Sequence, residues 1–437
     1  MRRLIVALTV SLLTGATWSV EPPDIRITSS PNPIGSGARA TAMGGAFIAI
    51  ADDSTASSWN PAGLAQLERP EMSIVGEGFF RLEDLFSDVH PESDGDSGID
   101  LYRINFANAS YPFVLFDRPM VVSLNYQRLY GFDRELSFDF NTGNALLSQE
   151  GEYEFEQEGD LYAFSPAFGM RLSDKLSVGA TLNVWRDPLG RDYAWKSTVR
   201  YDGTGLVEET DAFGATIFMR DVYKDFSGEN FNLGLRYELT PRIALGAVFK
   251  SPFTADVRHE RKRSTSVDFG GGADPVLTGF SRKEEMDFPW VVGVGTAVQW
   301  TRSLKTSLDV TRTEWDDFVL EDDHGNRFSA VTGRRASEED IDPTYTVRAG
   351  MEYLIFTERA IVPLRAGVFY DPEPSHRHPD DYAGVSVGSG YVSEALSLDF
   401  SYTWRFGRNV GGDVLDVPGA RMDVDQHQLL VSIIKYF

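Results

Sequence analysis

The chain has 437 residues, of which 42% are hydrophobic and 12% aromatic, and its formal net charge at pH 7 is −24. So acidic a chain is not expected to bind nucleic acid, whose phosphate backbone attracts basic surfaces. The absence of cysteine excludes disulfides, thiolate metal sites, a thiol nucleophile and a lipid anchor on a cysteine.

The first twenty residues have the pattern of a secretory signal. Arg2 and Arg3 precede an apolar run at 4–13, and small residues follow between Gly15 and Ser19. We therefore expect a signal peptide over residues 1–19. Beyond it, no apolar run approaches the roughly 18 residues of a membrane-spanning helix, whereas the strands of a barrel need no such run.

Apolar and polar residues alternate in many segments, which is the pattern of strands with one apolar and one polar face. In 395–406, for example, Leu398, Phe400 and Tyr402 alternate with Asp399 and Ser401. Fourteen candidate strands follow: 71–80, 100–112, 119–130, 160–172, 175–187, 230–239, 242–251, 286–300, 303–313, 343–356, 360–370, 382–392, 395–406 and 422–437.

The connections between these strands alternate in length. Short turns lie at 116–119, 173–174, 240–241, 301–302, 357–359 and 393–394, and long polar segments lie at 81–99, 131–159, 188–229, 252–285, 314–342, 371–381 and 407–421. Short turns at one end and long loops at the other are typical of an outer-membrane barrel. The last strand puts Leu429, Val431, Ile433 and Phe437 on one face, as a closing strand would. We predict an all-β fold, a 14-stranded antiparallel transmembrane β-barrel over 70–437.

Residues 20–69 precede the first strand and are rich in Gly, Ala, Ser and Pro. They hold too few large apolar residues for a core of their own. A fourteen-stranded ring is wide enough to leak water and ions unless it is filled. We therefore expect this segment to lie in the lumen.

Within this segment, residues 35–64 read GSGARATAMGGAFIAIADDSTASSWNPAGL. Gly44 and Gly45 permit a close backbone approach, while Asn60, Pro61 and Ala62 begin a turn in which Asn caps and Pro fixes φ. This stretch resembles the N-terminal hatch of the FadL/TodX family of outer-membrane transporters.

The resemblance implies a hatch, or plug, over 20–69 inside a barrel of the outer membrane. It also implies passive uptake of hydrophobic molecules, most of all long-chain fatty acids, by a porin-like monomer surrounded by lipids and lipopolysaccharide. Asn60, Pro61 and Ala62 would then form the gate, and Arg39 and Asp52 would latch the hatch to the wall. No cofactor and no metal are expected.

Two other roles stay open. The hatch sequence also resembles that of the PorV-like branch, whose members serve protein secretion and surface attachment. Such a partner should offer a large protein-binding surface and no ligand-sized cavity in its lumen. A general porin should have an open polar lumen, which a hatch argues against.

The segment 188–229 holds many large apolar residues for a loop: Tyr193, Trp195, Tyr201, Phe213, Ile217, Phe218, Met219, Tyr223 and Phe226. Such groups pack together or meet an apolar ligand. One interpretation is capture of a hydrophobic substrate by Tyr193, Trp195, Phe213, Phe218 and Phe226. The other is a small core that closes the barrel mouth, and the two are compatible.

Four arginines lie on the polar faces of predicted strands: Arg103, Arg236, Arg348 and Arg365. A guanidinium in a largely dry lumen is suited to bind a carboxylate through two hydrogen bonds. The alternative is pairing with the lumenal carboxylates of Glu238, Asp309, Glu352 and Asp399. For any one arginine, we favour the pairing.

The sequence offers no catalytic signature. We find no Ser/His/Asp arrangement, phosphate loop or dinucleotide fingerprint. The acidic loops lack the spacing of a calcium loop, and His376 and His378 beside Asp380 and Asp381 indicate at most a weak metal site. We therefore do not expect an enzyme.

Overall fold

The structure, a computed structural model, describes residues 33–88, 94–143, 147–207, 211–411 and 420–437. The predicted signal peptide, 1–19, and the first part of the predicted hatch, 20–32, lie outside the described residues. In the described part of the chain, no helix is long and apolar enough to cross a membrane.

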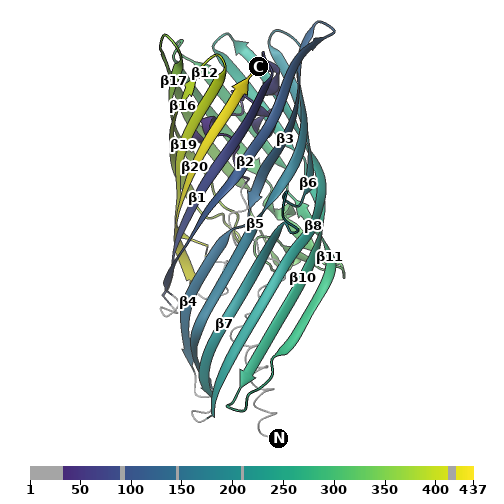
Figure 1. The fold of residues 1–437 in the computed structure, drawn as a ribbon, viewed down its shortest axis with the longest axis vertical. Helices are drawn as coiled ribbons and strands as arrows, with labels where there is room; N and C mark the ends of the chain where they lie inside the picture. Colours follow the sequence, from purple (N-terminus) through teal and green to yellow (C-terminus); the bar gives the residue numbers. More distant parts are fainter. Residues whose placement is uncertain (1–32, 89–93, 144–146, 208–210, 412–419) are drawn as a thin grey trace.

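Fourteen strands of the described chain form a closed antiparallel ring (Figure 1). The ring strands are β1 (Glu71–Ser87), β2 (Gly95–Leu115), β3 (Arg118–Gly131), β5 (Leu147–Arg171), β6 (Leu176–Arg186), β8 (Asp211–Thr240), β9 (Ile243–Lys250), β12 (Val291–Gln299), β13 (Leu304–Thr313), β16 (Thr344–Phe356), β17 (Ile361–Tyr370), β18 (Tyr382–Val392), β19 (Leu396–Val410) and β20 (Ala420–Tyr436). They correspond one to one to the fourteen predicted strands, so the predicted fold class is confirmed.

The ring closes where β1 pairs with β20, from Glu71 opposite Tyr436 to Ser87 opposite Ala420. The two faces of the wall differ as the alternation predicted. On β20, Val431 and Ile433 point outward and are exposed, whereas Ser432 between them is buried in the lumen. An apolar outer face and a polar inner face are what a barrel in a lipid bilayer needs.

Beyond one end of the ring, the wall continues as an open sheet, which we call the extension. It contains the first halves of β5 and β8, which run on into the ring without a break, and six further strands. These strands are β4 (Arg134–Gly143), β7 (Trp195–Val207), β10 (Phe253–Asp268), β11 (Val276–Phe288), β14 (Val319–Glu321) and β15 (Arg327–Ser329). Two short 3-10 helices, η3 (Trp315–Asp317) and η4 (Ala336–Glu338), adjoin them in sequence.

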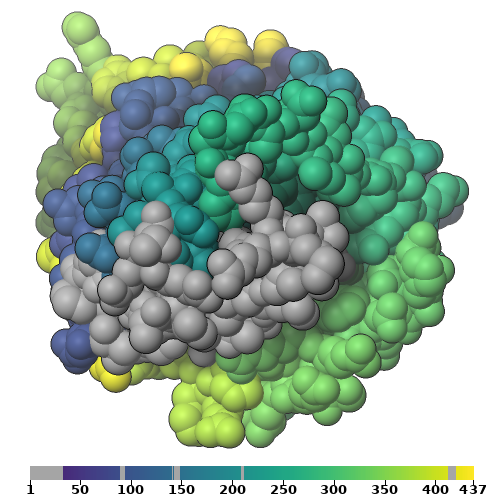
Figure 2. All heavy atoms as spheres, turned by 90° about the horizontal axis from the view of Figure 1, so that it is seen from below, coloured from purple at the N-terminus to yellow at the C-terminus, as the bar shows by residue number. Residues whose placement is uncertain are grey.

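The extension corrects one prediction. The segments 131–159, 188–229 and 252–285 were predicted as loops because they are polar, but much of each is strand, whereas 314–342 holds only the short strands β14 and β15. In β5, for example, Glu152, Glu154 and Glu156 alternate with Tyr153 and Phe155, so one face is charged and the other covers the barrel mouth. A strand in water needs only one apolar face. In Figure 2, which shows this end of the molecule, the teal and green segments from the middle of the chain form much of the rim.

The described residues 33–69, which we call the plug segment, lie inside the ring. They form α2 (Ala38–Ala42), α3 (Ala56–Trp59) and η1 (Pro61–Gln66). The helix η1 starts with the predicted turn, because the Asn60 side chain accepts a hydrogen bond from the Ala62 backbone N–H and Pro61 takes the first helical position. Most plug residues are fully buried, and Met43, Phe47, Ile50 and Leu64 share a core with Val121, Ala167 and Ala297 of the wall.

Glycines on the inner face of the wall make room for the plug backbone. A Cβ atom built on Gly179 would overlap the carbonyl group of Pro61, and one built on Gly367 would overlap the backbone of Gly44. Gly246 and Gly350 meet the carbonyl oxygens of Ile48 and Met43 in the same way. Because only glycine leaves this space free, the sequence of the wall is matched to the plug.

Candidate functional site

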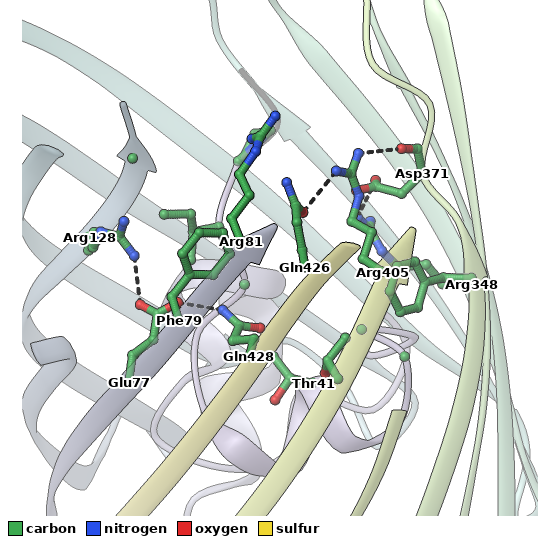
Figure 3. Close-up of a pocket in the computed structure, with 18 of the residues that line it drawn as sticks. Thr41, Glu77, Phe79, Arg81, Arg128, Arg348, Asp371, Arg405, Gln426 and Gln428 are labelled. Carbon is green, nitrogen blue, oxygen red and sulfur yellow. Dashed lines mark hydrogen bonds and ion pairs between the residues drawn. The ribbon is translucent and has the colours of Figure 1, made fainter. Parts of the chain in front are cut away.

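A cavity of about 170 Å³ lies in the lumen between the plug segment and the wall (Figure 3). Its apolar lining comes from both partners: Pro33, Ile34 and Trp59 of the plug, and Phe79 and Phe369 of the wall. A larger hollow of about 890 Å³ lies on the extension, next to Phe253 and Phe288, and does not touch the plug. We take the lumenal cavity as the candidate site because any solute that crosses the ring must pass the plug beside it.

One polar side of the cavity is built on β19 and β20, where Arg405 lies opposite Gln426 in the register. Arg405 donates from Nη1 to Glu373 Oε1 (2.6 Å) and to Gln426 Oε1 (3.0 Å), and from Nη2 to the Asp371 carbonyl oxygen (2.8 Å). Its guanidinium also lies 3.9 Å from the centre of the Tyr382 ring. This arginine is therefore fixed in place by its neighbours.

Three buried polar atoms on this side have no hydrogen-bond partner in the described structure: Arg405 Nε, which lies 3.3 Å from an Asp371 oxygen, Gln426 Nε2 and Thr403 Oγ1. All three residues line the cavity, and Gln426 is 6% exposed. Buried donors without a partner are costly, so a ligand with an acceptor atom would be favoured here. The cavity thus combines apolar walls with a small number of hydrogen-bonding groups, as ligand sites commonly do.

A second polar side belongs to β1 and β3, on the same stretch of the wall, because β1 pairs with β20. Arg128 donates from Nη1 to Glu77 Oε2 (2.6 Å) and also forms an ion pair with Asp160. Glu77 accepts a further hydrogen bond from Gln428 of the neighbouring strand β20. The carboxylates on this side are already engaged by the wall itself.

The four arginines that the sequence pointed to are all paired with carboxylates. Arg103 bridges Asp133 and Asp160, Arg236 binds Glu238, Arg348 binds Asp371, and Arg365 bridges Glu352 and Asp399. Glu238, Glu352 and Asp399 thus pair with these arginines as expected. Asp309 does not, and instead accepts a hydrogen bond from the backbone N–H of Ile48 (2.8 Å). Among the four, only Arg348 lines the cavity.

Sequence reasoning did not single out Arg81, Arg128 or Arg405, which also line the cavity. The alternation of polar and apolar residues could have identified them, because each of these arginines lies on the inner, polar face of its strand. What the sequence could not show is that β1, β3 and β19 meet the plug at the same height in the lumen.

The predicted gate residues lie at the contact between plug and wall. Asn60 donates from Nδ2 to the carbonyl oxygens of Ile48 (2.8 Å) and of Leu235 in β8 (3.1 Å). Arg39 pairs with Asp52 within the plug (2.5 Å) and donates from Nε to Glu352 of β16 (3.0 Å). Lys305 of β13 reaches Asp52 at 3.4 Å. These contacts join the plug to the wall, and Arg39, Asp52 and Glu352 also line a separate, mainly polar-rimmed space of about 320 Å³ between the plug and the wall.

The five predicted capture residues lie in different places. Trp195 is fully buried, stacks on Tyr223 with ring centres 4.4 Å apart and shares a core with Phe226 where the extension meets the ring. Phe213 is buried against Phe269, whereas Tyr193 donates from its hydroxyl to Glu158 Oε1 (2.6 Å). Phe218 is 40% exposed, on the opposite face of β8 from Phe213 and Met219. The structure therefore does not gather these five residues into one surface.

The histidines that the sequence placed near a weak metal site bind carboxylates instead. His376 Nδ1 lies 2.9 Å from Glu339, and His378 Nδ1 lies 3.3 Å from Asp342. In the described residues, the one group with metal-binding spacing is Asp322, Asp323 and His324, in the turn between β14 and β15 of the extension.

A closed antiparallel barrel with an apolar outer face, and with its own N-terminal segment buried in the lumen, is the architecture of an outer-membrane transport protein. The sequence profile described as Outer membrane protein transport protein (OMPP1/FadL/TodX) matches residues 32–428. The chain therefore belongs to the FadL/TodX family of outer-membrane proteins that transport hydrophobic compounds.

Solved structures share the fold. A FadL homologue of Pseudomonas aeruginosa is 16% identical, with 93% of this chain and 99% of that chain covered and a TM-score of 0.61. The toluene transporter TodX of Pseudomonas putida is 15% identical, with 94% and 100% covered and a TM-score of 0.59. The monoaromatic hydrocarbon channel CymD is 16% identical, with 92% and 98% covered and a TM-score of 0.54. A search of curated protein sequences returned no match.

Proposed function

We propose that this protein takes up small hydrophobic molecules across the outer membrane by passive diffusion, and that the lumenal cavity is a binding station on the path. The observation that carries the proposal is the cavity of about 170 Å³ between the plug segment and the wall. A molecule held there has the plug on one side and polar barrel wall on the other. The path contains no chemical step and needs no cofactor.

The size of the cavity favours a ligand of about one aromatic ring. An engineered protein cavity of about 150 Å³ binds benzene, whereas drug-sized ligands occupy about 300–1,000 Å³. Solved relatives are named as a toluene transporter and a monoaromatic hydrocarbon channel, which supports the same size class for this chain. A long-chain fatty acid, the ligand expected from the sequence, would fit only in part unless the plug moved.

Passage requires the plug to move, because the plug is held on several sides of the lumen. Its backbone binds Ser432 and Ser386 of the last strands, and Asn60 binds β8. We place Asn60, Pro61 and Ala62 at the pivot and the Arg39 and Asp52 contacts at the latch. The aromatic side chains of the extension, Phe218 foremost, remain our candidates for first capture.

A disulfide lock tests this movement, since the chain has no cysteine of its own. The hydroxyl oxygens of Ser54 in the plug and Ser73 in β1 lie 3.0 Å apart, so Ser54→Cys with Ser73→Cys can tie the plug to the wall. Ser110→Cys with Ser123→Cys is the matched control, because those hydroxyls lie 2.9 Å apart on two wall strands.

The measurement is uptake of labelled toluene and labelled palmitate by cells with an intact outer membrane. We expect oxidation to stop toluene uptake in the plug lock and a reductant to restore it, with no change in the wall control. Uptake at the parent's rate through the oxidised lock would contradict a moving plug. If the parent moves neither compound and copurifies with a secreted protein, the PorV-like role replaces this proposal. That role has no need for a ligand-sized lumenal cavity.

A further inference from the structure

The space of about 320 Å³ beside the Arg39 contacts shares no lining residue with the lumenal cavity. Its rim includes Glu68 and Arg69, which are exposed just before β1 begins. There β1 meets the end of β20, at the end of the ring that carries the short turns and lies opposite the extension (Figure 1). In an outer-membrane barrel, the end with the short turns faces the periplasm.

Glu71 differs from the other buried carboxylates of this lining. Its side chain is 4% exposed, and Oε1 has no hydrogen-bond partner. In the part of the chain that the structure describes, neither an arginine nor a lysine forms an ion pair with it. By contrast, Asp52 and Glu352 both pair with Arg39. A buried carboxylate without such a partner is costly, so binding of a cation beside it would be favoured.

The lining as a whole is negatively charged. It holds three guanidiniums and six carboxylates, which are those of Asp52, Asp53, Glu68, Glu71, Glu352 and Asp399. Arg39 and Arg365 are already bound to carboxylates of this group, and Lys305 reaches Asp52 from outside the lining at 3.4 Å. The third guanidinium, that of Arg69, is exposed at the rim and donates to a backbone carbonyl oxygen. Negative charge therefore remains in excess.

One side of this space is apolar, whereas the inner face of a barrel wall is ordinarily polar. Apolar side chains occupy inward positions at the short-turn ends of β16, β17, β18 and β20: Leu354, Ile361, Val392 and Ile434. Ile434, for example, lies two residues after the inward Ser432. Leu67 of the plug segment adds to this side. The space thus combines an unpaired carboxylate with an apolar surface.

We propose that this space binds an amphipathic organic cation, an amine whose ammonium group lies at Glu71 and whose apolar part lies against Ile434 and Leu67. The inference goes beyond the proposed function, because the site lies apart from the lumenal cavity. An ammonium group at a buried carboxylate forms charge-assisted hydrogen bonds. The volume falls within the range of about 300–1,000 Å³ that is usual for small-molecule sites. A metal ion fits less well, because it would leave the apolar surface unused.

Calorimetry on the purified protein tests the site with three six-carbon probes: hexylamine, hexanol and hexanoate. We expect the parent to bind hexylamine most tightly and hexanoate least. In Glu71→Gln, which keeps the shape and removes the charge, the ratio of hexylamine to hexanol affinity should fall by about tenfold or more. Ile434→Gln removes apolar contact, so it should weaken hexylamine and hexanol by similar factors and leave their ratio unchanged. Glutamine already occupies inward positions of β20, at Gln426 and Gln428.

Glu358→Gln is the matched control, because Glu358 is an exposed carboxylate in the short turn between β16 and β17, at the same end of the ring. It should bind all three probes as the parent does. Heat-modifiable mobility on a gel reports whether each variant is assembled, and the shared detergent controls for partition of the probes into micelles.

A parent that binds hexanol as tightly as hexylamine would overturn the site without any variant. So would an unaltered ratio in an assembled Glu71→Gln. Toluene uptake by the parent reports on the proposed function separately, because the two sites share no lining residue.

Discussion

The side-chain amide of Asn60 lies where any side chain on Gly234 would have to be. A Cβ atom built on Gly234 would overlap Asn60 Oδ1, while Asn60 Nδ2 donates to the carbonyl oxygen of the next residue, Leu235, at 3.1 Å. Gly234 of the wall and Asn60 of the plug therefore pack directly against each other, with no room for a larger residue at position 234.

Gly234→Val should displace the plug and leave the ring assembled, because valine suits a strand but overlaps the plug. Overpacking of this kind costs about 1–3 kcal/mol. We expect an increase in ion conductance in planar bilayers. Gly76→Val is the control, since a Cβ atom on Gly76 meets nothing within 4 Å. Equal conductance in the two variants would show that this contact does not hold the plug.

The closing aromatic residue should matter for assembly. Phe437 is 66% exposed on the lipid-facing side, and its backbone N–H donates to the Pro70 carbonyl oxygen (2.9 Å), which joins the two ends of the ring. We expect Phe437→Ser to lower the fraction of heat-modifiable protein in the outer membrane. Phe116→Ser is the control, because Phe116 is an even more exposed aromatic in a short turn. If both variants lost a similar fraction of assembled protein, exposed aromatic residues would be needed in general, and Phe437 would not act as a specific assembly signal.

Substitutions at Trp195 and Phe218 should have different effects, the first on folding of the extension and the second on capture of the ligand. Trp195→Ser removes a fully buried ring, and such truncations cost about 3–5 kcal/mol, so the extension should become sensitive to protease. Phe218→Ser should leave protease resistance unchanged and slow the uptake of labelled toluene. Normal uptake with Phe218→Ser would remove this residue from the capture step.

The extension should lose stability as the pH rises, because of His259 in β10. The imidazole is fully buried, with Nε2 at 2.7 Å from Asp221 of β8 and Nδ1 at 3.0 Å from Glu284 of β11. Burial lowers the pKa of His259, but the hydrogen bonds to these carboxylates outweigh burial, so its pKa is raised. Arg261 and Arg282 also face this group, through ion pairs with the same two carboxylates.

A raised pKa in the folded state means that the imidazolium stabilises the extension fully below about pH 6.5, the unfolded value. That contribution is lost as the pH rises through the folded pKa. We expect limited proteolysis of the extension to accelerate at alkaline pH in the parent. The pH dependence should become flatter in His259→Gln but persist in His324→Gln, whose ring is exposed. An unchanged pH profile in His259→Gln would assign the effect to other groups.

The ring could be predicted because each of its strands carries its own signal. Leu398 and Phe400 must face lipid and Asp399 must not, and that requirement is local to a few residues. The extension was missed for the converse reason. Its strands carry Glu152, Glu154 and Glu156 on the face in water, and a charged segment of this kind has the same composition as a loop.

The site was only partly predictable. Arg348 was identified from its place on a polar strand face, and Asn60 from its turn. Gln426 and Trp59 were not, because they come from two distant segments that the closed ring brings together. A sequence pattern within one segment cannot show which residues of different strands lie at the same level along the barrel axis.

The plug contacts also set an order of events during assembly. Ala38 binds Ser432, which is 394 residues further along the chain, and Gly44 binds Ser386, 342 residues further along. The segment made first therefore finds its partners only when β18 and β20 are in place. Contacts of such long range form late and slowly. A chain that stalls before its last strands would consequently be both unsealed and unplugged, so a half-built barrel is a hole in the cell's outer permeability barrier.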